Sequence, residues 1–333
     1  MKSSTRATLA SCRLADLGLA REMRPGHTQD PQVILDQYEF DTFWYDAFWC
    51  DDYLTLICPK LFGLYDALKD GEFFLDGNPV QKYRIHKGSK TFDRIRIHAK
   101  TPPGKVSFSY KGNNVKTSVS NSEIDQSRFA GKNCAVTLSK NNDLLWIEDF
   151  ARYHKQVHGL EGMLFFDNGS KAYDLEEIEE ALWRGGLTEV AVVSAPFRYG
   201  PSTYRPNGKL SYLTAFLQPS LLELARTRFL SSARAVLQCD IDELVWCDSG
   251  SIFDLAKSKL TGFVHLGVEW RYAKNDGSWG MRHSDHTLRK RGDSPCRAKY
   301  CICPKGALGF SRWEVHSLGI NSRRSALIEP KSE

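Results

Sequence analysis

A short apolar run that ends abruptly in acidic residues is the feature that most constrains the fold of this chain. The run Ala235-Val-Leu-Gln-Cys239 is followed directly by Asp240-Ile-Asp242-Glu243. This pattern predicts a buried strand whose carboxyl end opens into a cleft. On a continuing strand, Asp240 and Asp242 would share one face. Carboxylates held so close repel each other without a nearby cation, which favours Mg²⁺ or Mn²⁺ there. A solvated strand end is the alternative.

The chain upstream of this run alternates between strand-like and helix-like segments. Strands are predicted at 134–138, 162–166 and 190–194, and helices at 145–158 and 174–184. Such alternation with short connections is typical of a parallel α/β sheet. Ligands bind outside the carboxyl ends of the strands in these sheets. Polar clusters fall at three such ends: Lys140/Asn141, Asp167/Asn168 and Asp240/Asp242.

The two predicted helices carry local signals of their own. In 145–158, the apolar face is predicted to hold Trp146, Phe150, Tyr153 and Val157. Gly159 is expected to end this helix. Asp174-Leu-Glu-Glu177 has the form of a capping box that opens the second helix, and Gly185-Gly186 is expected to close it.

The order of these motifs resembles that of nucleotide-diphospho-sugar glycosyltransferases with the GT-A fold, in the family 92 and family 2-like branch. The similar segments, over roughly residues 132–320, are the strand with Lys140-Asn141, the Trp146 helix, Leu164-Phe-Phe-Asp-Asn-Gly-Ser170, Asp240-Ile-Asp-Glu243, Val268-Glu-Trp270-Arg-Tyr272 through Gly277, Arg297-Ala-Lys299 through Pro304, and Val315-His316. One position departs from the pattern. Asn142 follows Asn141 where such enzymes often carry glutamate.

The resemblance implies a metal-dependent enzyme of the hexosyltransferase type, inverting, that moves a sugar from a nucleoside-diphosphate donor to a glycan or other hydroxyl acceptor. A UDP-sugar is the favoured donor, and polysaccharide biosynthesis the expected role. The expected nucleotide contacts are Thr137, Lys140, Asn141, Asp167 and Asp240. Mn²⁺ or Mg²⁺ would be held by Asp240, Asp242 and His316 and would bridge the two phosphates. The candidate general bases are Asp276, Glu269 and Asp285.

A basic run, Thr287-Leu-Arg-Lys-Arg291, together with Arg297, Lys299 and Lys305, fits three interpretations. A solvated strand needs no ligand. A nucleic-acid patch would carry interleaved aromatic residues and a recognised motif, and neither is present, so no nucleic-acid partner is expected. In a sugar transferase, Arg289 and Lys299 would stabilise the departing diphosphate, whose charge grows in the transition state.

Length and composition fit a mid-sized catalytic domain with a smaller module. The chain has 333 residues, of which 41% are hydrophobic and 26% charged, and a net charge of +5. The predicted organisation is a poorly ordered tail at 1–30, a β-rich, sandwich-like module at 31–130 and a GT-A α/β domain, Rossmann-like with a mostly parallel sheet, at 131–333. No apolar run approaches the ~18 residues of a membrane span. Nine cysteines without paired short spacings suggest reduced thiols. We therefore expect a cytoplasmic protein, with peripheral membrane association left open.

The predicted module at 31–130 shows short alternating runs divided by turn-forming pieces such as Asp76-Gly-Asn-Pro79. The aromatic stretch 40–49 fits either a sugar-stacking platform or the core of this module. Trp270 and Trp279 likewise fit either acceptor stacking or burial. Residues 209–229 are predicted as a helix, kinked at Pro219, that packs beneath the metal strand.

Two other classes of function stay open. A metal-dependent nucleotidyltransferase or phosphohydrolase could use the same acid pair. Two ions would need a third carboxylate, however, and on a strand Glu243 would point away from Asp242. A non-catalytic carbohydrate-binding protein would rely on the aromatic module and would tolerate loss of Asp242.

A zinc site is another interpretation. Cys296, Cys301 and Cys303, with His283 and His286 nearby, could supply ligands on one side of such a site only.

Overall fold

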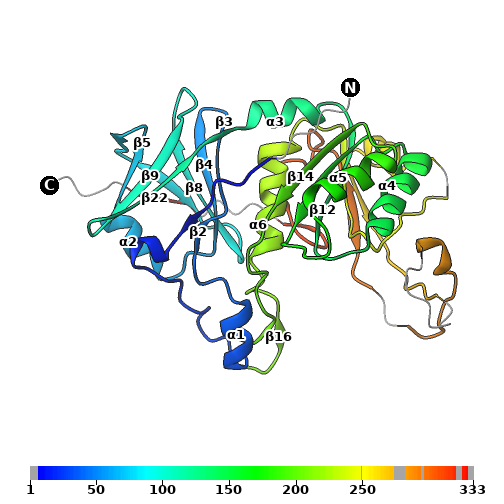
Figure 1. The fold of residues 1–333 in the computed structure, drawn as a ribbon, viewed down its shortest axis with the longest axis horizontal. Coiled ribbons are helices and arrows are strands. Elements are labelled where there is room, and N and C mark those ends of the chain that lie inside the picture. The colour runs from blue at the N-terminus through cyan, green and yellow to red at the C-terminus, as the bar shows by residue number, and fades with distance from the viewer. Residues whose placement is uncertain (1–6, 249, 274–281, 294–295, 320–324, 329–333) are drawn as a thin grey trace. The chain divides into compact units, whose positions relative to one another are not determined.

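The computed structural model describes residues 7–248, 250–273, 282–293, 296–319 and 325–328. The chain forms two compact units (Figure 1). The α/β unit comprises Met1–Thr8, Gln126–Pro196 and Phe229–Gly319, and the β unit comprises Leu9–Asp125, Phe197–Arg228 and Ile320–Glu333. Each unit is therefore assembled from segments that are far apart in the sequence.

The α/β unit contains a six-stranded sheet with the order β14-β13-β12-β17-β19-β18. Its strands are β12 (Asn133–Ser139), β13 (Gly162–Asp167), β14 (Glu189–Ser194), β17 (Ala235–Gln238), β18 (Phe263–Leu266) and β19 (Lys299–Ile302). The first four strands in this order are parallel to one another, and β19 is antiparallel to both of its neighbours. The predicted mostly parallel sheet is confirmed. Because β18 runs in the direction of β17, the carboxyl ends of five strands share one edge.

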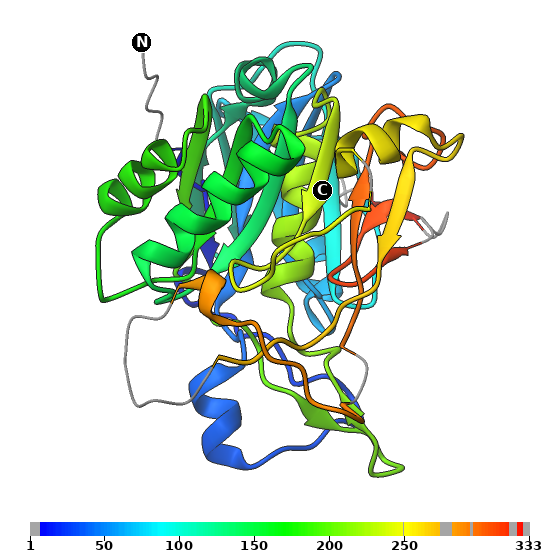
Figure 2. The same ribbon diagram turned by 90° about the vertical axis from the view of Figure 1, so that its right-hand side faces the viewer.

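Helices cover one face of this sheet. The helices α4 (Leu144–His158) and α5 (Leu175–Arg184) lie side by side there (Figure 2), and their buried side chains join those of β12, β13 and β17 in one core. The helix α7 (Ile252–Ser258) contacts β17, β18 and β19. The remaining elements of the unit are η3 (His283–Asp285), β20 (Arg312–Trp313) and β21 (Leu318–Gly319).

The ends of α4 and α5 follow from local chemistry. The Asp143 side chain accepts a hydrogen bond from the N–H of Leu145 (2.8 Å), and α4 ends at Gly159, which has a left-handed φ of 71°. The predicted capping box of α5 is confirmed, since Asp174 and Glu177 cap each other reciprocally.

The buried face of α4 differs from the prediction. It is formed by Ile147, Phe150, Ala151, His154 and His158, whereas Val157 is 46% exposed. The prediction holds for Phe150 and in part for Trp146, which packs against the core. The rest of the face differs because two histidines, which are polar by sequence, are buried with hydrogen-bond partners.

The β unit contains two sheets that enclose one hydrophobic core. One has the order β10-β9-β5-β6 and the other β11-β3-β4-β8-β7-β22. The strands are β3 (Asp46–Cys50), β4 (Tyr53–Pro59), β5 (Glu72–Leu75), β6 (Asn78–Pro79), β7 (Tyr83–His86), β8 (Phe92–His98), β9 (Lys105–Tyr110), β10 (Asn113–Ser118), β11 (Ser120–Asn121) and β22 (Ser325–Ile328). Smaller elements are β1 (Cys12–Arg13), η1 (Ala15–Leu17), α1 (Pro31–Gln37), β2 (Thr42–Trp44), α2 (Leu64–Asp70), β15 (Thr203–Tyr204), β16 (Leu210–Ser211) and α6 (Leu217–Leu224). Two helices cross the unit boundaries along the chain: α3 (Ser122–Phe129) and the π-helical η2 (Ala225–Phe229).

The aromatic stretch 40–49 belongs to the interior of the β unit. Phe43, Trp44, Tyr45, Phe48 and Trp49 are all buried. The Trp44 and Trp49 indole N–H groups donate to backbone carbonyls, at 2.9 and 2.8 Å. Of the two interpretations of this stretch, the structure therefore selects core packing, and no sugar platform is formed by these rings.

The division of the chain differs from the predicted boundaries in three places. The predicted α/β domain extended to residue 333, but Ile320–Glu333 belongs to the β unit, where β22 pairs with β7. Within the predicted tail, Leu14, Leu17 and Arg21 are buried, and Arg21 donates to three backbone carbonyls. The segment Phe197–Arg228 belongs to the β unit, where α6 contacts β4 rather than packing beneath β17. Pro219 lies in the first turn of α6, a position that tolerates proline without a kink.

Among the helices that the structure describes, none is long and apolar enough to cross a membrane.

The β unit is tied together by a buried cation. Arg228 is 3% exposed and forms ion pairs with Asp46 (2.8 Å) and Asp125 (2.7 Å). Arg228→Met would leave two carboxylates without this cation, so we expect the free energy of unfolding to fall by about 3–5 kcal/mol. Urea unfolding measures the change.

The matched control for this variant is Arg234→Met, which breaks the ion pair of Arg234 with the exposed Asp254 (2.5 Å). An exposed pair contributes less than about 1 kcal/mol. Equal losses in the two variants would contradict the special role of Arg228.

Candidate functional site

Hydrogen bonds join the loops that follow β12 and β13 at the carboxyl edge of the sheet. The backbone N–H of Asn141 donates to Ser170 Oγ (2.8 Å), and the Asn141 Oδ1 accepts from the N–H of Lys171 (2.8 Å). Asn141 has a φ of 55°, a left-handed conformation that asparagine tolerates better than most residues. The N–H of Asn168 donates to the carbonyl of Ser139 (2.8 Å). The turn at Asn141 is thus held by the neighbouring loop.

Asp167, at the end of β13, shapes its own loop. Its Oδ2 accepts from the N–H groups of Gly169 (3.1 Å) and Ser170 (3.0 Å), and its Oδ1 accepts from the Ser170 hydroxyl (2.5 Å). Asp167 is only 4% exposed. A hydrogen bond that a nucleoside donates to Asp167, as predicted, would have to share an oxygen with these bonds.

Asp240 and Asp242 lie in a turn and not on a strand, because β17 ends at Gln238. The N–H of Glu243 donates to the Asp240 carbonyl (3.2 Å), and the Glu243 Oε2 accepts from the N–H of Asp240 (3.1 Å). We call residues 240–243 the acid turn. The expectation that the two aspartates share a strand face is therefore wrong, since this reciprocal pair of hydrogen bonds bends the chain directly after Cys239. Asp242 is exposed and Asp240 is partly buried.

Lys299 is the cation of the acid turn. It is the first residue of β19, which runs antiparallel to β17, so it lies at the edge where β17 ends. Its Nζ forms an ion pair with Asp240 Oδ2 and lies 3.4 Å from Glu243 Oε2. Burial disfavours the ammonium, but the charges of Asp240 and Glu243 outweigh burial and raise the pKa of Lys299. Burial also raises the pKa of Glu243. Lys299 therefore stays charged beside the turn.

His316 is electrostatically coupled to the acid turn and has a defined tautomer. Its Nδ1 lies 3.1 Å from the carbonyl oxygen of Ala298. Because a carbonyl only accepts, Nδ1 carries the hydrogen and the lone pair is on Nε2. Burial and the charges of Lys299 and Arg297 lower the pKa of His316, although the Asp240 charge opposes them. His316 is therefore neutral near pH 7.

Three side chains of α4 hold the backbone of Val245, just beyond the acid turn. The Val245 N–H donates to His154 Nε2 (3.2 Å), and its carbonyl accepts from His158 Nε2 (2.8 Å) and the Tyr153 hydroxyl (2.8 Å). His154 Nδ1 donates to the carbonyl of Phe150 (2.8 Å), which leaves Nε2 as the acceptor. We call Tyr153, His154 and His158 the α4 clamp. The α4 clamp therefore fixes the position of the backbone just beyond the acid turn.

The segment around η3 docks on α4 and on the acid turn. Arg282 Nε donates to Asp149 Oδ2 (2.7 Å), and its Nη2 pairs with the other carboxylate oxygen. His283 Nε2 donates to the carbonyl of Ile241 (2.8 Å). The Trp146 ring lies against the His283 ring, with 5.2 Å between the ring centroids. Burial lowers the pKa of His283, so this residue is a neutral hydrogen-bond donor to the turn.

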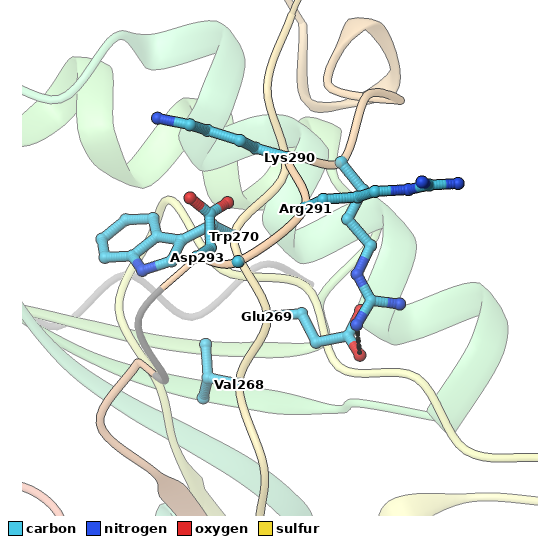
Figure 3. A pocket seen from close by; sticks show the side chains of 8 residues that line it. Val268, Glu269, Trp270, Lys290, Arg291 and Asp293 are labelled. Atoms are coloured by element: carbon cyan, nitrogen blue, oxygen red, sulfur yellow. Dashed lines mark ion pairs between the residues drawn. The ribbon is translucent and has the colours of Figure 1, made fainter.

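A cleft of about 690 Å³ opens where the chain leaves β18 (Figure 3). It is lined by Val268, Glu269, Trp270, Arg289, Lys290, Arg291, Gly292 and Asp293. The two stretches that form it are joined by a pair of backbone hydrogen bonds between Tyr272 and Leu288 (2.9 Å each). Glu269 pairs with Arg271 (3.2 Å) and Arg289 (3.3 Å).

The other residues predicted for the site are scattered. Thr137 lies on β12 and is 2% exposed, and its hydroxyl has no hydrogen-bond partner among the described atoms. Lys140 is exposed after β12, and Asp285 is exposed in η3. Asp276 and Trp279 lie outside the described residues. The structure thus gathers Asp240, Lys299 and His316 near the acid turn, and places Glu269 and Arg289 in the cleft.

Within the described part of the chain, no three side chains of His, Cys, Asp or Glu form a group that could hold one metal ion. Asp240 is instead paired with Lys299. Burial raises the pKa of the Cys301 and Cys303 thiols, which disfavours the thiolates that zinc binds.

The sequence analysis missed the residues that position the acid turn, namely Glu243, the α4 clamp and His283. One signal was present: His154 and His158 are four residues apart and so share a helix face. For His283 no local signal exists, because its partner Ile241 is 42 positions away.

No family model matches this chain, and no curated protein matches it significantly. The function is therefore argued from the site.

Acid is expected to weaken the fold through His154. Burial lowers the pKa of His154 to about 3, whereas an unfolded histidine titrates near ~6.5. Between these values the unfolded chain binds more protons, so the free energy of unfolding falls as the pH falls. This residue contributes at most about 1.4 kcal/mol per pH unit.

In His154→Gln this contribution should disappear and the dependence on pH should be shallower. Urea unfolding between about pH 4 and 6.5 measures the slope. His98→Gln, at an exposed histidine, is the control and should keep the wild-type slope. An unchanged slope in His154→Gln would speak against the neutral, buried state of His154.

Proposed function

We propose that this protein is a glycosyltransferase that moves a sugar from a nucleoside-diphosphate donor to a hydroxyl group of a glycan or related acceptor. The observation that carries the proposal is a convergence at one edge of the α/β sheet. The joined loops after β12 and β13, the acid turn after β17 and Lys299 at the start of β19 all lie at this edge. Ligands of such sheets bind outside these strand ends. The resemblance of the motifs to GT-A enzymes supports the same assignment.

The donor would lie across the strand ends. The loops at 139–142 and 167–171 are joined by hydrogen bonds, which gives the nucleoside a preformed support. A UDP-sugar is the donor that the resemblance favours. Lys299 would face the diphosphate, where its charge stabilises the leaving group. Arg289 lies in the cleft beyond β18, whereas Lys299 lies at the strand ends beside the acid turn, so Lys299 is the cation we assign to this role.

In this proposal, a divalent ion at the acid turn would be held by Asp242 together with His316. Asp242 presents an exposed carboxylate, and the tautomer of His316 presents the Nε2 lone pair. Mn²⁺ accepts both kinds of ligand, and Mg²⁺ favours the oxygen. When bound, the ion would supply a Lewis acid for the departing diphosphate. With Asp240 held by Lys299, two protein ligands remain, which leaves coordination positions for phosphate oxygens.

The acceptor hydroxyl must lose a proton during an inverting transfer. Glu269 is the candidate base that the structure places in the cleft beyond β18. Asp285 accepts from the N–H of Arg282 (2.7 Å) and lies in η3 instead.

The nine free thiols support the proposed cytoplasmic location.

The alternative functions find less support. A two-ion nucleotidyltransferase needs a third carboxylate, but Glu243 accepts from the N–H of Asp240 and from the Cys239 thiol and lies beside Lys299. A non-catalytic carbohydrate-binding function was expected to use the aromatic stretch 40–49, whose rings are buried.

Asp242→Asn should nearly abolish sugar transfer, because the leaving diphosphate loses a ligand of its Lewis acid. The barrier should rise on the order of several kcal/mol. The fold should persist, since Asp242 is exposed. The assay is UDP release from a panel of UDP-sugars with Mn²⁺ and with EDTA.

Asp248→Asn, at an exposed carboxylate of the same segment, should retain wild-type transfer. Calorimetry with UDP and Mn²⁺ tests binding separately from turnover. Transfer at the wild-type rate in EDTA or in Asp242→Asn would refute the metal role. Failure of the wild-type protein to bind UDP would refute the function.

Lys299→Met should impair both folding and transfer, since Asp240 and Glu243 would lose the cation between them. A loss of about 1–3 kcal/mol in unfolding free energy is expected, since the ammonium is buried but Asp240 is partly exposed. Lys299→Arg keeps the charge and should recover most of the stability but less of kcat, because a planar guanidinium cannot take the position of the ammonium. Lys257→Met, at an exposed lysine of α7, is the control. A Lys299→Met protein with wild-type stability and kcat would contradict the assignment.

A further inference from the structure

The cleft beyond β18 lies on the same sheet edge as the acid turn. Leu266, the last residue of β18, is the register partner of Lys299, which carries the ion pair with Asp240. The cleft begins two positions later, at Val268. It therefore begins close in sequence to the edge at which the donor is proposed to bind.

The cleft combines an aromatic ring with carboxylate acceptors. Trp270 is 50% exposed, so a large apolar ring is accessible in the lining of the cleft. Asp293 accepts a hydrogen bond from the Tyr272 hydroxyl, and its Oδ2 is buried without a partner among the described atoms. Both residues line the cleft (Figure 3). A sugar ring offers an apolar C–H face for the indole, and its hydroxyl groups can donate to accessible acceptors in the lining.

The cleft also carries an excess of positive charge. Its lining holds three cations, Arg289, Lys290 and Arg291, and two anions, Glu269 and Asp293. The Glu269 carboxylate already forms ion pairs with Arg289 and Arg271. Lys290 and Arg291 have no ion pair among the described residues, and Figure 3 shows them extending in opposite directions. Cations of this kind at a sugar site suit a ligand that carries negative groups along its length.

We propose that this cleft is the acceptor subsite and that it takes an anionic glycan, with one sugar ring stacked on Trp270 and acidic groups of the chain paired with Lys290 and Arg291. The inference rests on the proposed function and adds the class of acceptor to it. A nucleic acid also has rings and negative charges, so RNA binding is a separate outcome of the test. The proposed transfer to a glycan hydroxyl group favours the glycan as the ligand.

The test is binding of defined oligosaccharides to the full chain, measured by calorimetry and by saturation-transfer NMR. The probes are tetragalacturonate, its fully methyl-esterified form, a sulfated chondroitin tetrasaccharide and a short single-stranded RNA. At least one anionic oligosaccharide should bind, and the methyl ester should bind at least about tenfold more weakly than tetragalacturonate if the latter is the one bound. Trp270→Ala should raise the Kd about tenfold, and so should Lys290→Gln with Arg291→Gln.

Matched controls lie outside the cleft. Trp246→Ala removes another exposed indole, 75% accessible, and Lys257→Gln with Lys259→Gln removes two exposed lysines. Both should bind as wild type does. The proposal is overturned if neither anionic oligosaccharide binds, if the cleft variants bind as tightly as the controls, or if RNA binds more tightly than either glycan. UDP binding in the same preparations reports on the donor site, so a failed acceptor site and a failed transferase assignment give different results.

Discussion

The ion pair between Lys299 and Asp240 is the interaction on which the proposed site depends. A parallel sheet brings the loops after its strands to one edge, and here it brings three acidic residues there within four positions. Without a cation these carboxylates would repel one another and open the turn. A strand that begins at this edge can place its first side chain beside the turn. β19 is such a strand because it is antiparallel to its neighbours, and Lys299 is its first residue.

Lys299 alone does not fix the position and orientation of the acid turn. β17 is short, and after Gln238 the chain has no strand partner. The α4 clamp replaces the missing ladder, since it satisfies both the N–H and the carbonyl of Val245 with side chains of a helix that packs on the same core. Buried backbone groups need such partners. His283 adds a third constraint through the carbonyl of Ile241. The acid turn is thus positioned from the sheet, from α4 and from η3, which is the preorganisation that a donor site requires.

Local sequence patterns carried the prediction of the α/β sheet and its edge. The runs at β12, β13, β14 and β17, the capping box of α5 and the stop at Gly159 are signals within a few residues of one another, and each was placed correctly. The predictions that failed concerned features that depend on contacts between residues far apart in the sequence. Hydrogen bonds to Val245 allow His154 and His158 to be buried although they are polar. The buried face of α4 could therefore not be predicted from the spacing of apolar residues. The assignment of Phe197–Arg228 to the β unit depends in the same way on Arg228 meeting Asp46, 182 positions earlier.

The candidate site was predicted in part for the same reason. The positions of Asp240 and Asp242 at a strand end followed from the run before them. Their conformation did not, because the turn is made by Glu243, which the strand model placed on the other face. Lys299 and Asp240 are 59 positions apart, and their contact follows only from the register of an antiparallel strand.

Charge is separated along the shared edge of the sheet. The turn after β17 carries Asp240, Asp242 and Glu243, with Lys299 as its cation, whereas the cleft after β18 carries more cations than anions. An anionic acceptor that lay on the acid turn would meet like charge, and one that lay in the cleft meets opposite charge. A donor diphosphate is also an anion. At the turn, Lys299 and a divalent ion would therefore have to offset the charge of the carboxylates. The antiparallel strand β19 lies between the two regions and separates them. Its insertion thus provides the lysine for one side and the spacing for the other.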